Sequence, residues 1–493
     1  MRTRSANVLV LYDARATFTS TVQEHLRSFW MYSRHHVLFA AATITNAPAV
    51  DLSLFDAVIV HYSVRICLRD HLQPKYVEAL RSFSGFKALF IQDEYDTTET
   101  ARKAIAHLGI HVVFTCVPRD LIPEVYPPER FPGVEFLPTL TGFVPIALPQ
   151  DPPPTETRPL LIGYRGRRLP YWYGDLGQEK LEIGRRMKEL CRARNLPVDI
   201  EWDDSRRVYG ADWYRFLQRS KATLGTECGS NLFDDHGEVR RAIEAALRKT
   251  PDATYEELRP KLIAPYEGKV KMNQISPKIF EAIACRTALV LFEGEYSGVV
   301  IPDVHFIPLK KDFSNATEVL EKLQDDAYLE KLSRQAYKDV IEPGRFSYRE
   351  FIDQVDRLIS HRIGAGQGVE LISVLRGARS NDSQALEGSS PGRPLSSGIA
   401  TDFPLRGFEA EDLELERRGS GKGGGMWYFG TSSRYSALDR RVLPLPRSLR
   451  GPAKLAVLSW RLLPKGLREA AGPRIDSLLK RLRRLVRALR TSA

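Results

Sequence analysis

Ionisable residues of this 493-residue chain stand where predicted β-strands end. His61 follows the apolar run 58–60, and Asp93 and Glu94 follow the run 88–91. Because the carboxyl ends of parallel strands form the ligand-binding edge of an α/β sheet, we expect these side chains to face a ligand. His61 is a candidate hydrogen-bonding residue, and Asp93 or Glu94 a candidate base or orienting group. The alternatives are a core histidine and a charged turn.

A basic turn follows the predicted strand 160–163. Its sequence is Gly163-Tyr164-Arg165-Gly166-Arg167-Arg168. Glycines let the backbone approach a ligand, and arginines neutralise phosphate oxygens through paired hydrogen bonds. Arg165 and Arg168 are therefore the candidate phosphate ligands, and a solvated basic turn is the alternative.

A second phosphate site is indicated where a helix begins at Ser276-Pro277-Lys278. Proline suits the first helical turn, and a helix N-terminus attracts a diphosphate, so Ser276 and Lys278 are candidate ligands. Glu281 lies one turn further and can accept hydrogen bonds from the ribose hydroxyls of a nucleotide. A surface glutamate is the alternative.

A third polar segment, Thr226-Glu227-Cys228-Gly229-Ser230-Asn231, comes directly after another predicted strand. Glu227 and Asn231 are candidates for contacts with ligand hydroxyls. A structural Gly-Ser-Asn turn explains the same residues equally well.

The elements that position these residues alternate between strands and helices of about ten residues, which predicts an α/β fold with parallel sheets. The expected strands are 8–11, 37–41, 57–60, 88–91, 111–116, 160–163, 198–201, 222–225, 288–292 and 305–308. The expected helices are 20–32, 74–83, 98–108, 179–194, 213–219, 236–249, 254–263, 277–285, 316–323 and 348–359.

The proline-rich segment 148–154 predicts a stiff linker between two Rossmann-like domains, 1–147 and 155–361, that face a ligand cleft. Residues 362–440 form a predicted third region. Within it, 377–426 are rich in Ser, Gly, Arg and Pro, which predicts a mostly disordered linker. The last predicted region, 441–493, is a basic amphipathic tail.

The charge of the chain is concentrated in that tail. Its net charge is +11, but residues 441–493 carry fourteen Lys and Arg against Glu469 and Asp476, so residues 1–440 are nearly neutral. A nearly neutral body argues against nucleic acid as a partner. The sequence shows neither a signal-peptide core nor a membrane-spanning run, which predicts a cytoplasmic protein. Five scattered cysteines predict buried thiols rather than disulfides or a zinc site.

The helix sequence Glu281-Ala282-Ile283-Ala284-Cys285 resembles the donor-binding helix of retaining GT-B glycosyltransferases. Further segments resemble the spore-maturation glycosyltransferase-like group, and together they cover about residues 6–360. These segments are Ile91-Gln92-Asp93-Glu94-Tyr95, Leu224-Gly225-Thr226-Glu227, Asn231-Leu232-Phe233-Asp234, Phe292-Glu293-Gly294-Glu295-Tyr296-Ser297-Gly298, Phe306-Ile307-Pro308-Leu309 and Asp312-Phe313-Ser314-Asn315.

The resemblance implies transfer of a sugar from a nucleotide-sugar donor to a glycan or lipid-linked glycan, without a metal or other cofactor. The donor would lie in the C-terminal domain and the acceptor in the N-terminal domain, with Arg165 stabilising the departing diphosphate. Two positions depart from the pattern, because Asn273 and Arg286 replace the usual Glu and Gly. The alternatives are a nucleotide-sugar epimerase and a non-catalytic glycan-binding or envelope-assembly protein.

The tail combines an apolar stripe with a basic surface. The apolar residues from Ile475 onwards recur at helical spacing, and Lys and Arg fill the positions between them. Such a helix binds at the headgroups of an anionic membrane, which would bring the protein to the cytoplasmic face. Docking on the protein body or on a partner is the alternative.

Full-length protein is therefore expected to co-sediment with anionic liposomes at low salt, because each basic residue near the surface contributes about 1 kcal/mol. Neutral liposomes and a truncation ending at Gly364 serve as controls. Failure of the full-length protein to bind, or equal binding by the truncation, would contradict the prediction.

Overall fold

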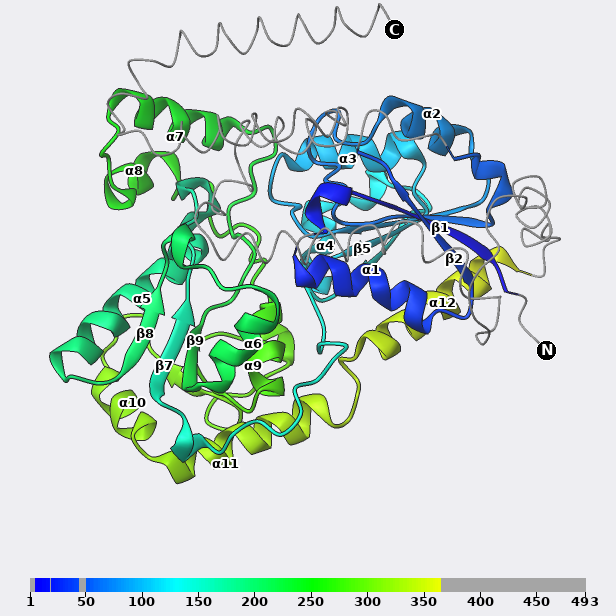
Figure 1. Cartoon of the computed structure of the whole chain (residues 1–493). Coiled ribbons are helices and arrows are strands. Elements are labelled where there is room, and N and C mark those ends of the chain that lie inside the picture. Colours follow the sequence, from blue (N-terminus) through cyan, green and yellow to red (C-terminus); the bar gives the residue numbers. More distant parts are fainter. Residues whose placement is uncertain (1–4, 18, 44–49, 365–493) are drawn as a thin grey trace, which may run out of the picture. The chain divides into compact units, whose positions relative to one another are not determined.

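The computed structural model describes residues 5–17, 19–43 and 50–364. Figure 1 shows these residues as coloured ribbons. The predicted disordered stretch 377–426 and the predicted tail 441–493 lie outside the described residues.

The first sheet is built from the N-terminal third of the chain. Its order is β2-β1-β3-β4-β5-β6, and all neighbouring strands are parallel. The strands are β1 (Asn7–Tyr12), β2 (His36–Ala41), β3 (Ala57–Val60), β4 (Phe86–Ile91), β5 (Val112–Thr115) and β6 (Glu135–Pro138). The helices of this part are α1 (Ser20–Tyr32), α2 (Pro74–Ser82), α3 (Thr98–Leu108) and α4 (Ile122–Val125).

The second sheet has the order β11-β10-β9-β7-β8 and is also parallel throughout. Its strands are β7 (Leu160–Arg165), β8 (Val198–Glu201), β9 (Ser220–Gly225), β10 (Ala288–Phe292) and β11 (Ile307–Leu309). The helices that follow in the chain are α5 (Gly174–Ala193), α6 (Gly210–Gln218), α7 (Glu238–Lys249), α8 (Tyr255–Leu262), α9 (Pro277–Ala284), α10 (Ala316–Leu323), α11 (Asp326–Ala336) and α12 (Tyr348–Ile363).

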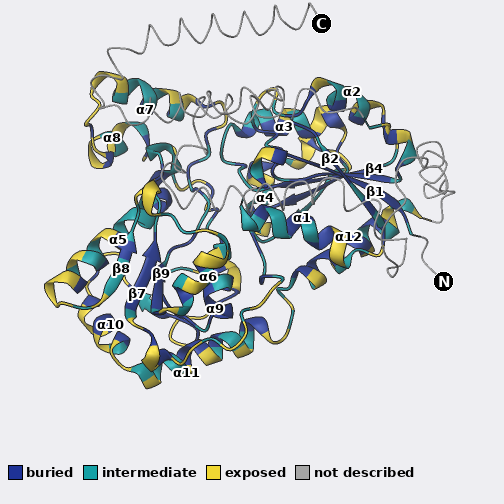
Figure 2. Cartoon of the chain, viewed as in Figure 1, coloured by how far each residue is buried: buried dark blue, intermediate teal, exposed yellow. Residues whose placement is uncertain are grey.

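Each sheet is buried on both faces, as its continuous apolar strands require. In β1, Leu9 and Leu11 pack with α2 and α3, whereas Val8 and Val10 pack with α1 and α12. The second sheet likewise has one apolar cluster with α5, α10 and α11 and another with α6 and α9. Figure 2 shows the buried strands in dark blue, and the exposed residues lie mainly on helices and loops. The predicted fold class, α/β with two Rossmann-like sheets, is confirmed.

Three elements were missing from the sequence prediction: the short helix α4, strand β6 and helix α11. Strand β6 is a half-buried edge strand that ends at Pro138, and therefore lacks the apolar run of a central strand. Helix α11 begins at an Asp325 N-cap, whose side chain accepts a hydrogen bond from the Tyr328 N–H at 2.9 Å. It continues into a π-helical turn, Tyr337–Ile341.

The last helix, α12, corrects the predicted boundary at residue 361. We assigned it to the C-terminal domain, but Phe351, Val355 and Ile359 pack into the core cluster beneath the first sheet. The sequence could not show this, because the apolar face of an amphipathic helix indicates that the helix packs against another element but not which element that is.

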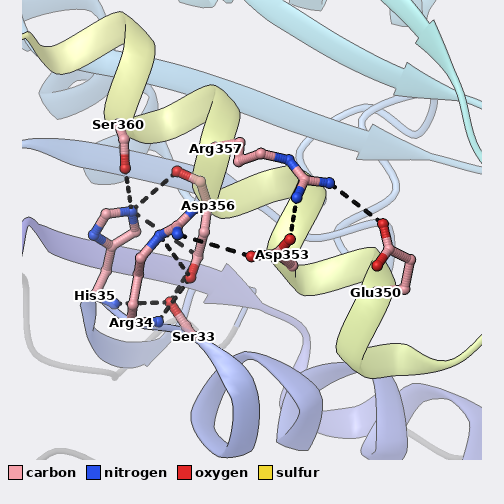
Figure 3. Close-up of polar contacts among 8 residues, drawn as sticks. All are labelled: Ser33, Arg34, His35, Glu350, Asp353, Asp356, Arg357 and Ser360. Atoms are coloured by element: carbon pink, nitrogen blue, oxygen red, sulfur yellow. Dashed lines mark hydrogen bonds and ion pairs between the residues drawn. The ribbon is translucent and has the colours of Figure 1, made fainter. Parts of the chain in front are cut away.

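A buried carboxylate fixes α12 to the first sheet (Figure 3). Asp356 is 2% exposed and accepts hydrogen bonds from the Ser33 hydroxyl at 2.8 Å and the Arg34 N–H at 2.7 Å. His35 Nδ1 accepts from the Ala6 N–H at 3.2 Å, so its Nε2–H is the donor toward the backbone oxygen of Asp356 at 3.3 Å. The network therefore links α12 to the segment between α1 and β2.

The five cysteines are free, and four of them are buried, as predicted for small apolar side chains. In the described ranges, no helix is both long enough and apolar enough to cross a membrane.

We expect Asp356→Ala to lower the free energy of unfolding by about 2–4 kcal/mol, because it leaves buried donors without an acceptor. The matched control is Asp353→Ala, one turn earlier, whose side chain is 42% exposed and pairs with Arg34 across 3.8 Å. This control should cost less than about 1 kcal/mol. Urea denaturation of both variants measures the difference, and equal losses would contradict a special role for Asp356.

Candidate functional site

His61 is a buried core histidine, which corrects its prediction as a ligand contact. Its side chain comes directly after β3 and is 0% exposed. Its Nδ1 lies 2.8 Å from the Ser63 hydroxyl, and its Nε2 lies 3.1 Å from His25 Nδ1. Burial, followed by repulsion from His25, holds the pKa of His61 well below its usual value. Both ring nitrogens are therefore used within the protein.

Glu94 is likewise buried, and its predicted role as a base or orienting group stays a prediction. Its carboxylate is 0% exposed, and Oε1 accepts a hydrogen bond from the Cys116 N–H at 3.0 Å and another from the Thr115 hydroxyl. Burial raises the pKa of Glu94 to about 7. The alternation of side chains along the chain directs Glu94 inward.

Asp93 is the accessible member of this pair. Its side chain is 38% exposed, and Oδ2 lies 3.0 Å from Arg65 Nε. Tyr95 donates its hydroxyl to Oδ1 at 2.9 Å. These contacts fix the orientation of the carboxylate. Because the side chain is partly exposed, Asp93 can still accept a hydrogen bond from a ligand hydroxyl. Its role as a base or orienting group stays a prediction.

Arg165 is occupied within the protein, which corrects its prediction as a diphosphate ligand and catalytic cation. Its two terminal nitrogens bind Asp199 at 2.8 and 2.7 Å, and Nε donates to the Arg206 carbonyl at 2.8 Å. The guanidinium also stacks 4.2 Å from the centre of the Phe216 ring. It therefore ties β7 to β8. Arg168, three residues later, is exposed, and its phosphate role stays a prediction.

The cations that can meet a phosphate group lie around Lys278, near the carboxyl end of β7. The Lys278 ammonium donates to the Arg165 carbonyl at 3.0 Å and lies 5.2 Å from the centre of the Trp213 ring. The pKa of Lys278 is lowered to about 8, mainly by desolvation; the charge of Glu281 raises it, and repulsion from Lys180, Arg207 and Arg167 lowers it. We call these four basic residues, Lys180, Arg207, Arg167 and Lys278, the cation cluster.

Lys180 also has a lowered pKa. Burial is the main cause and repulsion from Arg167 adds to it, whereas Cys228 and Glu179 act in the opposite direction. In the described part of the chain, neither Lys180 nor Lys278 has an acid within 4.0 Å. An anion placed among these residues would relieve their mutual repulsion, so the arrangement suits a diphosphate.

Helix α9 begins beside this cluster, as predicted. Ser276 is its N-cap, its side chain makes no capping hydrogen bond, and Pro277 occupies the first turn. The Thr141 hydroxyl donates to the carbonyl of Ile275, and Gln92 donates to the Thr141 carbonyl at 3.2 Å. These bonds connect the start of α9 with the residue that follows β4. The phosphate role of Ser276 stays a prediction.

Glu281 faces the neighbouring helix α6. Its Oε2 accepts a hydrogen bond from the Trp213 indole N–H at 2.7 Å. Burial raises the pKa of Glu281, while the Trp213 hydrogen bond and the Lys278 charge lower it. Within the described residues, no hydrogen bond engages Oε1, which leaves it for the predicted contact with a ribose.

Glu227 is structural, which corrects its prediction as a sugar ligand. It is 4% exposed, and Oε1 accepts hydrogen bonds from the N–H groups of Glu295 at 3.1 Å and Tyr296 at 2.8 Å. Its Oε2 accepts from the Asn273 amide at 2.5 Å. A Glu at position 273 would place two carboxylates together, so Asn273 is the residue that this arrangement requires.

Asn231 also holds the backbone. Its Oδ1 accepts a hydrogen bond from the Met272 N–H at 2.9 Å, and its carbonyl accepts from the Gly268 N–H at 2.8 Å. The residue nevertheless lines a cavity beside α5, so a contact with a ligand stays a prediction.

Arg286, the second departure from the resemblance, has φ 48°. This left-handed conformation favours glycine, because a Cβ costs roughly 1 kcal/mol there. Its guanidinium lies 5.1 Å from the centre of the Tyr337 ring. The backbone at Arg286 thus has the left-handed conformation that the usual glycine would adopt.

Over residues 5–17, 19–43 and 50–364, no three His, Cys, Asp or Glu residues are grouped so as to hold a metal ion.

No family model matches the sequence, and no curated protein matches it. Among solved structures, TarM of S. aureus is 15% identical over 62% of this chain and 54% of its own, with a TM-score of 0.37. This chain therefore spans about half of TarM. T4 phage BGT in complex with its UDP-glucose substrate is 11% identical over 72% and 99% of the two chains, with a TM-score of 0.40. HepE of Anabaena, in complex with UDP and glucose, is 11% identical over 72% and 100%, with a TM-score of 0.42.

Four site residues were not among the sequence predictions. Lys180, Arg207 and Arg167 belong to the cation cluster, and Trp213 orients Glu281. Their sequence signal was weak, because a lysine in the second turn of a helix and an arginine in a loop are ordinary surface residues. These residues come together only because α5, α6 and α9 lie close to one another in the fold.

The affinity for a nucleoside diphosphate is expected to be constant below about pH 8 and to fall as the pH rises further. In the protein without ligand, the pKa of Lys278 is lowered to about 8. Above about pH 8 the lysine must therefore take up a proton before it can bind the anion. The loss should approach tenfold one unit above that pKa.

Isothermal titration calorimetry in two buffers of different ionisation enthalpy measures both the affinity and the proton uptake. Lys278→Met should remove the uptake, and exposed Lys338→Met is the control. Proton uptake that persists in Lys278→Met would assign the titration to another group.

Proposed function

We propose that this protein is a glycosyltransferase that moves a sugar from a nucleotide-sugar donor to a hydroxyl of a glycan or lipid-linked glycan. The observation that carries the proposal is the cation cluster beside the start of α9, in which Lys180 and Lys278 have lowered pKa values. Glu281, one turn into the same helix, has an oxygen available for the ribose.

The charges of the site indicate how this protein would promote the transfer. When the glycosidic bond of a nucleotide sugar breaks, negative charge grows on the departing diphosphate. Lys278 and Lys180 are close enough to repel each other, so they can stabilise that charge without rearranging, whereas Arg207 also pairs with Asp204 at 2.7 Å. Arg165 contributes indirectly, because its ion pair with Asp199 fixes the end of β7, whose carbonyl holds Lys278.

The acceptor would lie beside Asp93. Its carboxylate is partly exposed and is fixed by Arg65 and Tyr95. Such a carboxylate can accept a hydrogen bond from the attacking hydroxyl and orient its lone pair. The resemblance stated above favours metal-independent transfer in cell-surface polysaccharide assembly, and the basic tail favours a peripheral location on the cytoplasmic face of a membrane.

A thermal-shift screen against nucleoside diphosphates and their sugars tests the proposal. A ligand at one hundred times its Kd should stabilise the protein by about 2.7 kcal/mol. Incubation with the stabilising nucleotide sugar then separates the alternatives. A transferase needs an acceptor for full turnover, an epimerase converts the donor alone, and a binding protein converts nothing. Absence of any stabilisation would refute donor binding.

Glu281→Ala should weaken nucleotide binding by about 1–3 kcal/mol, the usual loss when a hydrogen bond to a charged group is removed. Glu321→Ala, an exposed residue of α10, is the matched control. Calorimetry compares the nucleoside diphosphate with inorganic pyrophosphate, which lacks the ribose. Equal losses for both ligands would show that Glu281 does not bind the ribose.

A further inference from the structure

A polar cavity of about 400 Å³ lies beside the start of α5, and the site described above does not account for it. Its charged or amide-bearing lining residues are Asp175, Glu179, Asn231, Arg259, Glu267 and Lys311. Arg259 belongs to α8, and Glu267 follows that helix, so the α7–α8 insertion between β9 and α9 completes the cavity. The volume is within the range of small-molecule sites.

Most charges in this lining are already paired. Arg259 Nε binds Asp175 Oδ1 at 2.6 Å, and Tyr255 donates to the same oxygen at 2.7 Å. The Lys311 ammonium binds Glu179 Oε1 at 2.6 Å. The lining therefore alternates fixed hydrogen-bond donors and acceptors.

Glu267 is the exception. Its side chain is 9% exposed, and Oε1 accepts a hydrogen bond from the Asp175 N–H at 2.6 Å. The other oxygen, Oε2, accepts no hydrogen bond from the part of the chain that the structure describes, and it is 3.9 Å from Arg259 Nη2. Leaving a buried carboxylate oxygen without a hydrogen bond is costly unless a ligand or water supplies a donor. Burial is also the main reason that the pKa of Glu267 is raised.

The chemistry of the lining identifies the ligand class. Three carboxylates against two cations disfavour a phosphate. The hydroxyl groups of a sugar ring both donate and accept hydrogen bonds, so they match an alternating lining that lacks one donor. Helix α5 carries residues of both sites, because Glu179 lines the cavity and Lys180 belongs to the cation cluster.

We propose that this cavity binds a sugar ring and that Glu267 Oε2 accepts a hydrogen bond from one of its hydroxyls. The inference rests on the proposed function. The ring belongs either to the nucleotide-sugar donor or to the acceptor glycan, and in both cases the α7–α8 insertion selects the sugar.

The decisive variant is Glu267→Gln, because the amide keeps the acceptor for the Asp175 N–H but puts an N–H₂ in place of Oε2. Glu182→Gln is the matched control, since Glu182 lies on α5, is 40% exposed and pairs with Arg185. Lys311→Met provides a second test at a half-exposed residue, so that the outcome does not depend on the folding of one variant. Thermal melting checks that each variant is folded.

Calorimetry with a nucleoside diphosphate and with its sugar conjugates separates the possibilities. If the donor sugar occupies the cavity, Glu267→Gln should lose about tenfold or more in affinity for the nucleotide sugar and keep its affinity for the nucleoside diphosphate. If the acceptor sugar occupies it, both affinities should persist and the KM for the acceptor should rise by a similar factor. Unchanged donor affinity and unchanged acceptor KM would overturn the proposal.

Failure of the proposed function gives a different result. In that case wild-type protein would bind no nucleotide at all, and free hexoses and hexosamines at millimolar concentration become the probe. Stabilisation of the wild type that Glu267→Gln abolishes would still support a sugar cavity. Absence of stabilisation by any of these monosaccharides would overturn it.

Discussion

A charge that is removed from water needs a partner, and this constraint determines which ionisable residues can serve a ligand here. Arg165 and Glu227 stand at strand ends, where a ligand site is expected, but each is nearly buried and bound on several sides by protein groups. Lys180 and Lys278 have lowered pKa values, and among the described residues neither has an acid within ion-pair distance. An anionic ligand would complete their environment, whereas Arg165 and Glu227 hold the framework around them.

The framework depends on a few such buried pairs. The Arg165–Asp199 pair fixes the end of β7, and the carbonyl of Arg165 in turn accepts the Lys278 ammonium. Glu227 fixes the loop after β10 through two backbone N–H groups, and Asn273 satisfies its second oxygen. Changing either partner alone would leave a buried polar group unsatisfied, so Glu227 and Asn273 stabilise this loop together.

The α7–α8 insertion and α12 both depend on contacts with distant parts of the chain. The insertion brings Arg259 and Glu267 to the start of α5. Helix α12 packs on the first sheet although it follows the second in the chain, and Asp356 supplies its buried polar anchor. Both cases join segments far apart in sequence through a carboxylate that is largely removed from solvent.

The sequence by itself determined the two α/β series and most element boundaries, because buried parallel strands and amphipathic helices leave local apolar patterns. It also located the helix start at Ser276 and the strand ends at Asp93 and Arg165. Only the tertiary structure decided that Asp93 is accessible while Glu94 is buried, and that Arg165 is paired with Asp199. Adjacent residues share the same local signals, but burial and pairing depend on neighbours that are distant in sequence.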